Sequence, residues 1–323
     1  METIQHGGRV LEACRRYPAA PKPFLDLSTG INPAPYPFDP PGPQAWRRLP
    51  EPEATAELEH EAAAAYGVSD PAMVVAAPGT QALIQLLPSL LTRPRIAVLA
   101  PTYAEHEAAW RAAGTEVEPV THLDRPALIL CNPNNPDGTR HDPRTLAAAA
   151  ARMDLLIVDE AFADFEPGLS LAPFLPLPRV VVLRSFGKTY GLAGLRLGFA
   201  LAEPGLAARI RHALGPWAVS GPAISIGVQA FRDRQYLETA RHQARMAATR
   251  LDSILHAHGL EVLGGTTLFR LARSPAAAKI ADRLGHAGIL VRTFAGEPTW
   301  LRFGLPADEP AWNRLGMALE PRP

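Results

Sequence analysis

Short, wholly or largely apolar segments recur along the middle of this chain, and stretches of helical length separate most of them. They span residues 73–77, 95–100, 127–131, 155–158, 180–183 and 199–201. A strand that is apolar along its whole length must be covered on both faces. The pattern therefore predicts an α/β fold in which a mainly parallel sheet, of the seven-stranded type, is sandwiched between helices.

The pattern changes on either side of this region. Residues 18–52 are crowded with proline and are expected to run extended, as an arm or a crossing between domains, before a helix over 53–66 that ends at Gly67. After about residue 234, a long helix over 236–256 leads into a smaller α+β domain. Its strands are expected at 261–263, 268–271, 289–292 and 300–303, and its helices near 275–287 and 309–319. We predict an arm over 1–40, a large domain over 41–235 and a small domain over 236–323.

The charge balance and the cysteine content indicate which kinds of partner the chain is expected to bind. The chain of 323 residues carries 32 Lys plus Arg against 32 Asp plus Glu, so no positive field favours nucleic acid or an anionic membrane. A small molecule or a second copy of the chain is the expected partner. Cys14 and Cys131 are too few for a disulfide framework or a thiolate metal site, and no metal is expected. With neither a signal pattern nor a long apolar run, the expected location is the cytoplasm.

Polar residues follow several of the predicted strands, where an open α/β sheet binds its ligands. Pro78-Gly79-Thr80-Gln81 opens an apolar helix; its N-terminus suits a phosphate, although Thr80 is equally consistent with an ordinary N-cap. The asparagine-rich run at 132–139 favours a functional loop over a simple turn. Asp159 and Glu160 follow another strand, where they are either helix caps or carboxylates that hold a cation.

The strongest motif is the segment 183–198. Ser185, Lys188 and Arg196 stand among four glycines directly after an apolar strand. The glycines let the backbone approach a ligand closely. The spacing fits neither a Walker loop nor a dinucleotide-binding loop. A solvated surface lysine is the alternative interpretation, and the surrounding motif disfavours it.

In this order, the four motifs resemble fold-type I pyridoxal-phosphate (PLP) enzymes of the aspartate aminotransferase superfamily, over nearly the whole chain. The resemblance implies that Lys188 forms a Schiff base with PLP and then acts as acid and base. Asp159 would pair with the protonated pyridine nitrogen, and Asn135 would hydrogen-bond the phenolic oxygen. It also implies a homodimer. The cofactor-binding residues that it carries over are Gly79, Thr80, Gln81, Tyr103, Asn135, Asp159, Phe162, Ser185, Lys188 and Arg196.

Terminal motifs resemble the branch that contains threonine-phosphate decarboxylases and histidinol-phosphate aminotransferases. His6-Gly7-Gly8, followed by residues 25–33, looks like the N-terminal signature of the decarboxylases; the alternative for His6 is a frayed tail. Arg292 and Arg302 lie on predicted strands, where ordinary surface or salt-bridged arginines are the alternative. By resemblance, Arg292 binds a substrate phosphate and Arg302 the α-carboxylate. The substrate-binding residues implied are His6, Gly30, Asn135, Arg292 and Arg302.

Two departures weigh against an aminotransferase. Phe162 stands where many relatives have a tyrosine bonded to the cofactor, and Gly187 stands where a serine is common. The prediction is therefore a PLP-dependent lyase that decarboxylates L-threonine O-3-phosphate to (R)-1-amino-2-propanol phosphate for cobalamin biosynthesis. A histidinol-phosphate-type aminotransferase is the alternative. A non-catalytic relative ranks lower, because the essential members of the cofactor pocket are all present: Lys188, Asp159, Asn135 and Arg196.

Overall fold

The computed structural model describes residues 6–166 and 168–320. Two compact units divide the chain. The large unit comprises residues 35–135 and 139–238, and the small unit comprises 1–34, 136–138 and 239–323. The predicted division at residues 40 and 235 stays a prediction. None of the helices in the described residues is long and apolar enough to cross a membrane.

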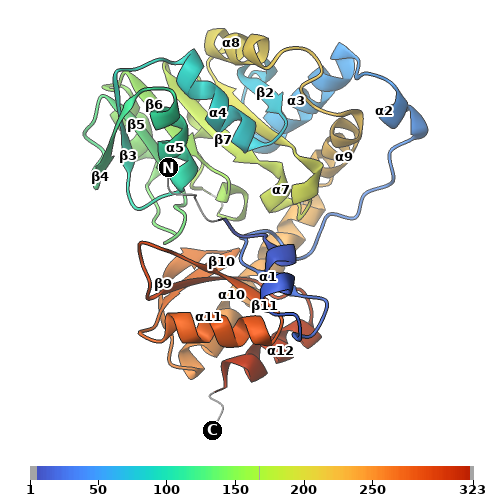
Figure 1. Ribbon diagram of the computed structural model, residues 1–323. Coiled ribbons are helices and arrows are strands. Elements are labelled where there is room, and N and C mark those ends of the chain that lie inside the picture. Colours follow the sequence, from blue (N-terminus) through green and yellow to red (C-terminus); the bar gives the residue numbers. More distant parts are fainter. Residues whose placement is uncertain (1–5, 167, 321–323) are drawn as a thin grey trace. The chain divides into compact units, whose positions relative to one another are not determined.

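The large unit is built on a seven-stranded sheet (Figure 1). All its strands run parallel except β8, which pairs antiparallel with both of its neighbours. This confirms the predicted α/β fold. In spatial order the strands are β2 (Val74–Ala77), β8 (Gly198–Ala202), β7 (Val180–Ser185), β6 (Leu155–Asp159), β5 (Ala127–Cys131), β3 (Arg95–Leu99) and β4 (Glu116–Val120).

The apolar side chains of successive strand residues point alternately to the two sides of this sheet, and both faces are buried. Along β6, Leu156 and Val158 join one core cluster, while Leu155 and Ile157 join another. Helices α3 (Pro52–Tyr66), α6 (Pro143–Ala150) and α9 (Gly221–Arg232) supply the first cluster. Helices α4 (Thr80–Leu90), α5 (Ala104–Ala112) and α8 (Pro204–Leu214) supply the second. Two-sided burial is the physical reason that the central strands have no polar face.

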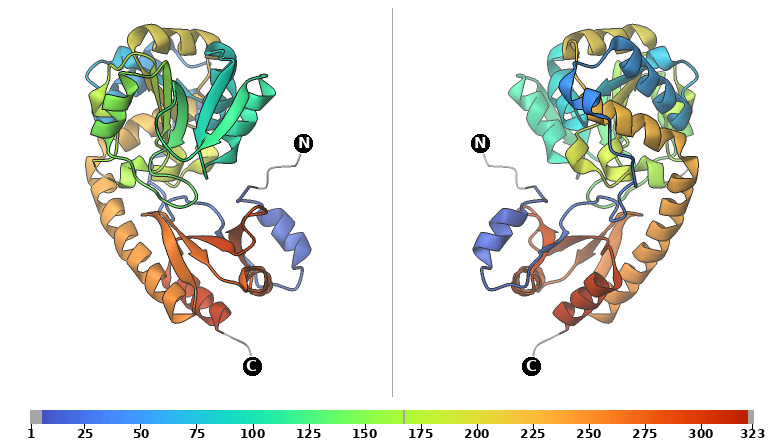
Figure 2. Two further views of the ribbon diagram at one scale, coloured as in Figure 1. Left: turned by 90° about the vertical axis from the view of Figure 1, so that its left-hand side faces the viewer. Right: turned by 90° about the vertical axis from the view of Figure 1, so that its right-hand side faces the viewer.

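The small unit contains a five-stranded sheet in the order β1 (Leu25–Leu27), β11 (Ile289–Thr293), β12 (Trp300–Gly304), β10 (Phe269–Arg273), β9 (Glu261–Thr266). Only the β1–β11 pair is parallel. The helices are α1 (Val10–Arg16), α11 (Ala277–His286), α12 (Glu309–Leu319) and the greater part of α10 (Arg234–Ala257), which Figure 2 shows as one long helix.

Several elements differ from the sequence-based expectation. The N-terminal segment supplies β1, so that the small sheet has a fifth strand. A short helix, α2 (Pro43–Arg47), interrupts the stretch expected to be extended, with Pro43 at its first position, where proline is tolerated. The edge strand β4 was not predicted, because its exposed glutamates leave only Val117 and Val120 as buried apolar residues.

Candidate active site

The N-terminus of α4 forms a candidate anion site. Gly79 precedes this eleven-residue helix with a φ of 85°, and a Cβ there would lie 2.8 Å from Nη2 of Arg196. A Cβ at Gly198 would lie 2.7 Å from the backbone nitrogen of Thr80. The glycines therefore let a guanidinium and the first turn of a helix approach each other closely. Together these donors suit a phosphate.

Lys188 lies on the short helix α7 (Phe186–Thr189), which follows β7 directly, and its side chain is half-buried. Ser185, the last residue of β7, is the register partner of Gly198 and is therefore near the anion site. A Cβ at Gly187 would lie 2.8 Å from Cα of Ala193. This close approach of backbone accounts for glycine, instead of serine, directly before the lysine.

Asp159 ends β6 and is buried beside two other chemically active side chains. Its Oδ2 lies 2.9 Å from Nε2 of His106, and its Oδ1 accepts a hydrogen bond of 3.0 Å from the backbone nitrogen of Ala161. Cys131, at the end of β5, is its register partner. Burial alone would lower the pKa of His106, but hydrogen bonds and charge from Asp159 and Cys131 outweigh it and raise that pKa to about 10.

Sequence reasoning missed His106. It lies three residues after Tyr103, on the same helix as the buried Ala109 and Trp110. A buried histidine at this spacing is ordinarily a core residue, so only the contact with Asp159 identifies it. Tyr103, at the N-terminus of α5, donates a hydrogen bond of 3.3 Å to Gln81, which ties these two predicted site residues together.

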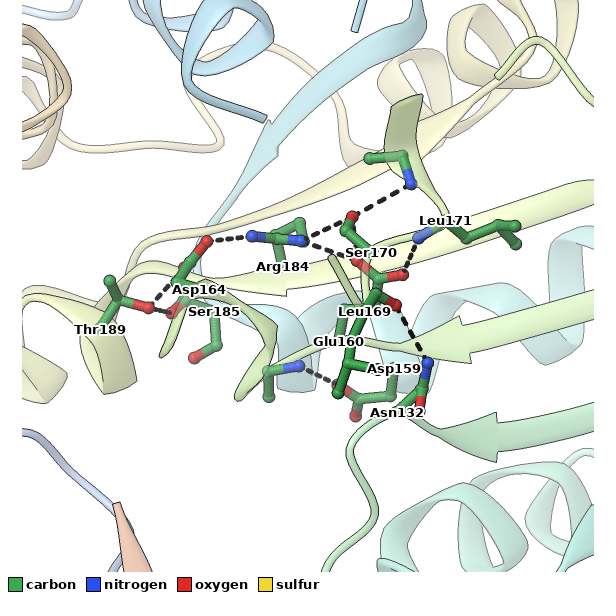
Figure 3. A network of polar contacts seen from close by, with 12 residues as sticks. Asn132, Asp159, Glu160, Asp164, Leu169, Ser170, Leu171, Arg184, Ser185 and Thr189 are labelled. Carbon is green, nitrogen blue, oxygen red and sulfur yellow. Dashed lines mark hydrogen bonds and ion pairs between the residues drawn. The ribbon is translucent and has the colours of Figure 1, made fainter. Parts of the chain in front are cut away.

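The asparagine-rich loop is held by its own side chains. The Nδ2 of Asn132 donates to the carbonyl oxygen of Leu169 (Figure 3) and to that of His141. The Nδ2 of Asn134 donates to the carbonyl oxygen of Pro101. Asn132 and Asn134 are therefore structural. Asn135, the residue predicted to contact the cofactor, follows them and is half-buried.

Glu160 belongs to a buried ionic network rather than to the ligand site (Figure 3). Its Oε2 lies 2.7 Å from Nη1 of Arg184, and burial raises its pKa, although Arg184 opposes that effect. Arg184 also pairs with Asp164, which accepts a hydrogen bond from Thr189. The network therefore connects the residue after Asp159 with the residue after Lys188. Phe162, also predicted as a site residue, is buried at the start of the 3-10 helix η2 (Ala163–Phe165).

In the small unit, Ser28 contacts both the N-terminal segment and Arg302, one of the predicted substrate residues. The backbone nitrogen of Gly8 donates to Oγ of Ser28 at 2.8 Å, and Nη2 of Arg302 donates to the Ser28 carbonyl at 3.0 Å. The exposed His6 precedes this contact, and the buried Gly30 follows it. Arg292 and Arg302 are register partners on β11 and β12. Their guanidinium groups lie against different rings: Cζ of Arg292 is 5.3 Å from the ring centre of Phe294, and Cζ of Arg302 is 4.8 Å from that of Phe269.

Comparisons with known proteins agree on one family. The profile of the aminotransferase class I and II family matches residues 43–314. A threonine-phosphate decarboxylase from Pseudomonas aeruginosa is 45% identical, over 98% of this chain and 97% of that protein. A histidinol-phosphate aminotransferase from Symbiobacterium thermophilum is 32% identical, over 71% of this chain and 68% of that protein. The structure of a histidinol-phosphate aminotransferase from Sinorhizobium meliloti, solved with pyridoxal-5'-phosphate, superposes with a TM-score of 0.79 at 22% identity, covering 99% and 98% of the two chains.

Proposed function

The chain belongs to the aminotransferase class I and II family, and from that premise we infer that it is a PLP-dependent threonine-phosphate decarboxylase. The observation that carries this inference is the 45% identity with such a decarboxylase over nearly the whole of both chains. Histidinol-phosphate aminotransferases match at lower identity and over less of the chain. The enzyme is a lyase of cobalamin biosynthesis, as the terminal sequence motifs predict.

The large unit fits PLP at two places. Gly79, Thr80 and Arg196 provide a cradle for the phosphate, which the missing Cβ atoms keep open. Asp159 provides a buried carboxylate for the pyridine nitrogen, 2.9 Å from His106. When bound, PLP withdraws electrons from the α-carbon of the substrate, so that a bond at this carbon can break.

Residues of the chain are assigned to attachment of the cofactor, proton transfer and orientation of the ring. We assign to the Lys188 amine the covalent attachment of the cofactor and the transfer of a proton to the α-carbon after carbon dioxide leaves. Asp159 would hold the positive charge at the ring nitrogen, and His106, whose Nε2 lies 2.9 Å from Oδ2 of Asp159, fixes the direction of that carboxylate. Asn135 and Tyr103 orient the ring. Phe162 is buried and supplies no hydroxyl.

The small unit supplies the proposed substrate contacts. Arg292 and His6 bind the phosphate of L-threonine O-3-phosphate, and Arg302 binds its carboxylate; Gly30 leaves room for the substrate. The cross-strand pairing of Arg292 and Arg302 supports a substrate with two anionic groups. Which bond breaks depends on its orientation to the ring. To act as a decarboxylase, the chain would therefore have to orient the substrate so that its Cα–carboxylate bond breaks, whereas an aminotransferase would orient the Cα–H bond for cleavage.

The assay that tests this function contains the PLP-loaded enzyme and L-threonine O-3-phosphate, without any oxo acid. We expect equal amounts of carbon dioxide and 1-amino-2-propanol phosphate over many turnovers, and no turnover by Lys188→Ala. An absence of carbon dioxide, together with conversion of the cofactor to pyridoxamine phosphate by histidinol phosphate, would instead establish the aminotransferase alternative.

We further propose that the enzyme works as a homodimer. Trp46 and Trp217 of the large unit are 69% and 58% exposed, and both line a hollow of about 440 Å³. A second copy of the chain is the proposed occupant of this surface, because aromatic side chains are enriched in protein interfaces. The cytoplasmic location, expected from the scarcity of cysteine, stays a prediction.

A further inference from the structure

His106, Cys131 and Asp159 form a cluster with three different donor atoms. An imidazole nitrogen, a thiol sulfur and a carboxylate oxygen all lie within 4.8 Å of one another. The three side chains are 2%, 5% and 5% exposed. They come from α5, β5 and β6, so that three packed elements fix their positions. The proposed activity uses Asp159 and His106 but gives no role to Cys131.

We propose that these three residues bind one Zn²⁺ or similar soft divalent cation when the chain carries no PLP. Zinc prefers nitrogen and sulfur donors with carboxylate oxygen, at about 2.0–2.3 Å, and commonly takes three protein ligands and an open fourth position. Tetrahedral ligands at these lengths lie about 3.3–3.8 Å apart. The Nε2 of His106 and the Oδ2 of Asp159 are 2.9 Å apart. A small side-chain movement therefore suffices to replace their shared proton by a metal ion.

The charges also fit. A thiolate, a carboxylate and a neutral imidazole together balance the two positive charges of the cation, so the buried complex is neutral. Binding releases the thiol proton of Cys131 and a proton from His106 to solvent. Sequence reasoning excluded a thiolate site because two cysteines are too few. The cluster instead combines one thiolate with two other ligand types.

Neighbouring groups already orient two of the ligands. The hydroxyl of Thr102 lies 3.2 Å from Sγ of Cys131. The backbone nitrogen of Ala161 donates to Oδ1 of Asp159, which leaves Oδ2 directed at His106. Such outer contacts are usual around metal ligands, because they fix the direction of each donor atom.

The site is proposed to exclude PLP. This step depends on the proposed role of Asp159 as the partner of the pyridine nitrogen, because a divalent cation held by that buried carboxylate would repel the positively charged pyridinium. Soft divalent cations would then compete with PLP for the chain, and cofactor loading would expel the metal.

Binding of Co²⁺ to the untagged, full-length, cofactor-free chain tests the site directly. We expect one equivalent to bind with the visible spectrum of tetrahedral cobalt that includes a thiolate ligand, and Zn²⁺ to displace it. Cys131→Ser and Cys131→Ala should weaken binding by about 100-fold or more. Cys14→Ser is the matched control, because Cys14 is the other cysteine and lies on α1 of the small unit. Equal cobalt binding by wild type and both Cys131 variants would overturn the proposal.

Competition is measured by adding PLP to the cobalt-loaded chain. Loss of the cobalt spectrum as the absorbance of bound PLP appears supports mutual exclusion, and simultaneous binding of both contradicts it. If the wild-type chain, prepared without metal, bound cobalt but did not bind PLP, the proposed function would be wrong and the proposed metal site would still be supported.

Discussion

The pairing of Asp159 with His106 makes the charge of the cofactor site depend on pH. The pKa of His106 is raised to about 10, against roughly 6.5 for an unperturbed histidine. A group whose pKa rises on folding stabilises the fold fully below its unfolded pKa. That stabilisation is lost as pH rises through the folded value. The pair should therefore contribute its full stability below about pH 6.5 and lose it towards pH 10.

The variant His106→Gln tests this dependence. Glutamine still donates a hydrogen bond to Asp159 but cannot take up a proton. Thermal unfolding of the cofactor-free wild type should therefore lose more stability between pH 6.5 and 10 than that of His106→Gln. Parallel loss of stability in the two proteins would show that His106 is not the titrating group.

Close backbone contact at the phosphate cradle gives a second prediction. In Gly198→Ala the new Cβ would lie 2.7 Å from the backbone nitrogen of Thr80, so the N-terminus of α4 must shift. We expect PLP to bind about tenfold more weakly or worse, as measured by equilibrium titration, since about 1.4 kcal/mol suffices for that factor. Gly205→Ala, on α8, is the matched control, because nothing lies within 4 Å of a Cβ there. Equal affinities would contradict the cradle.

Among single residues, sequence motifs predicted those whose residue type is unusual for the loop or strand end in which they occur. Lys188 and Arg196 stand in a glycine-rich loop that no ordinary core or surface explains. His106 gave no such signal, because a single histidine on a helix is usually a satisfied core residue. Its role depends on a contact with Asp159, 53 residues away in the chain.

Among the elements, the loops that follow β6 and β7 are held together by a buried cation. Arg184 pairs with Glu160 and Asp164, and its Cζ lies 4.4 Å from the ring centre of Tyr66. Removing the cation leaves two buried carboxylates uncompensated. Because Thr189 donates to Asp164, the same change also releases the turn that carries Lys188.

Arg184→Met should therefore destabilise the protein by about 3–5 kcal/mol and weaken PLP binding as well. Urea unfolding and PLP titration measure the two effects. Arg232→Met is the matched control: Arg232 also contacts two glutamates, Glu57 and Glu61, but is 53% exposed. Arg232→Met should change neither the stability nor the PLP affinity appreciably. Similar unfolding midpoints for the two variants would argue against a structural role for the buried network.

Elements were predictable where burial imposes a pattern on the sequence. The central strands are apolar on both faces and were all found. The edge strand β4 is half polar, and the three-residue strand β1 becomes a strand only by pairing with β11, which lies 264 residues later in the chain (Leu25 with Ile289). Pairing of this kind depends on the folded sheet and leaves little trace in the local sequence.

For the whole molecule, the exposed apolar surface around α2 predicts how two chains associate. Trp46, Leu49 and Trp217 are 69%, 62% and 58% exposed around one hollow, and a patch of this kind usually marks an interaction site. We expect the wild type to have twice the 34.7 kDa mass of one chain in light scattering. Trp46→Glu and Trp217→Glu should each raise the dissociation constant by about 30-fold or more, as for the central residues of an interface.

Met246→Gln is the control for this prediction, because Met246 is 63% exposed but lies on α10, in the small unit. An unchanged dimer in both tryptophan variants would place the interface elsewhere. The hollow also includes Gly194 and Leu195, which lead directly to Arg196 of the phosphate cradle. Association should therefore stabilise this loop, and the separated chains should bind PLP more weakly than the dimer. Titrating PLP at protein concentrations above and below the dissociation constant measures that coupling, since ligand binding and association must strengthen each other equally.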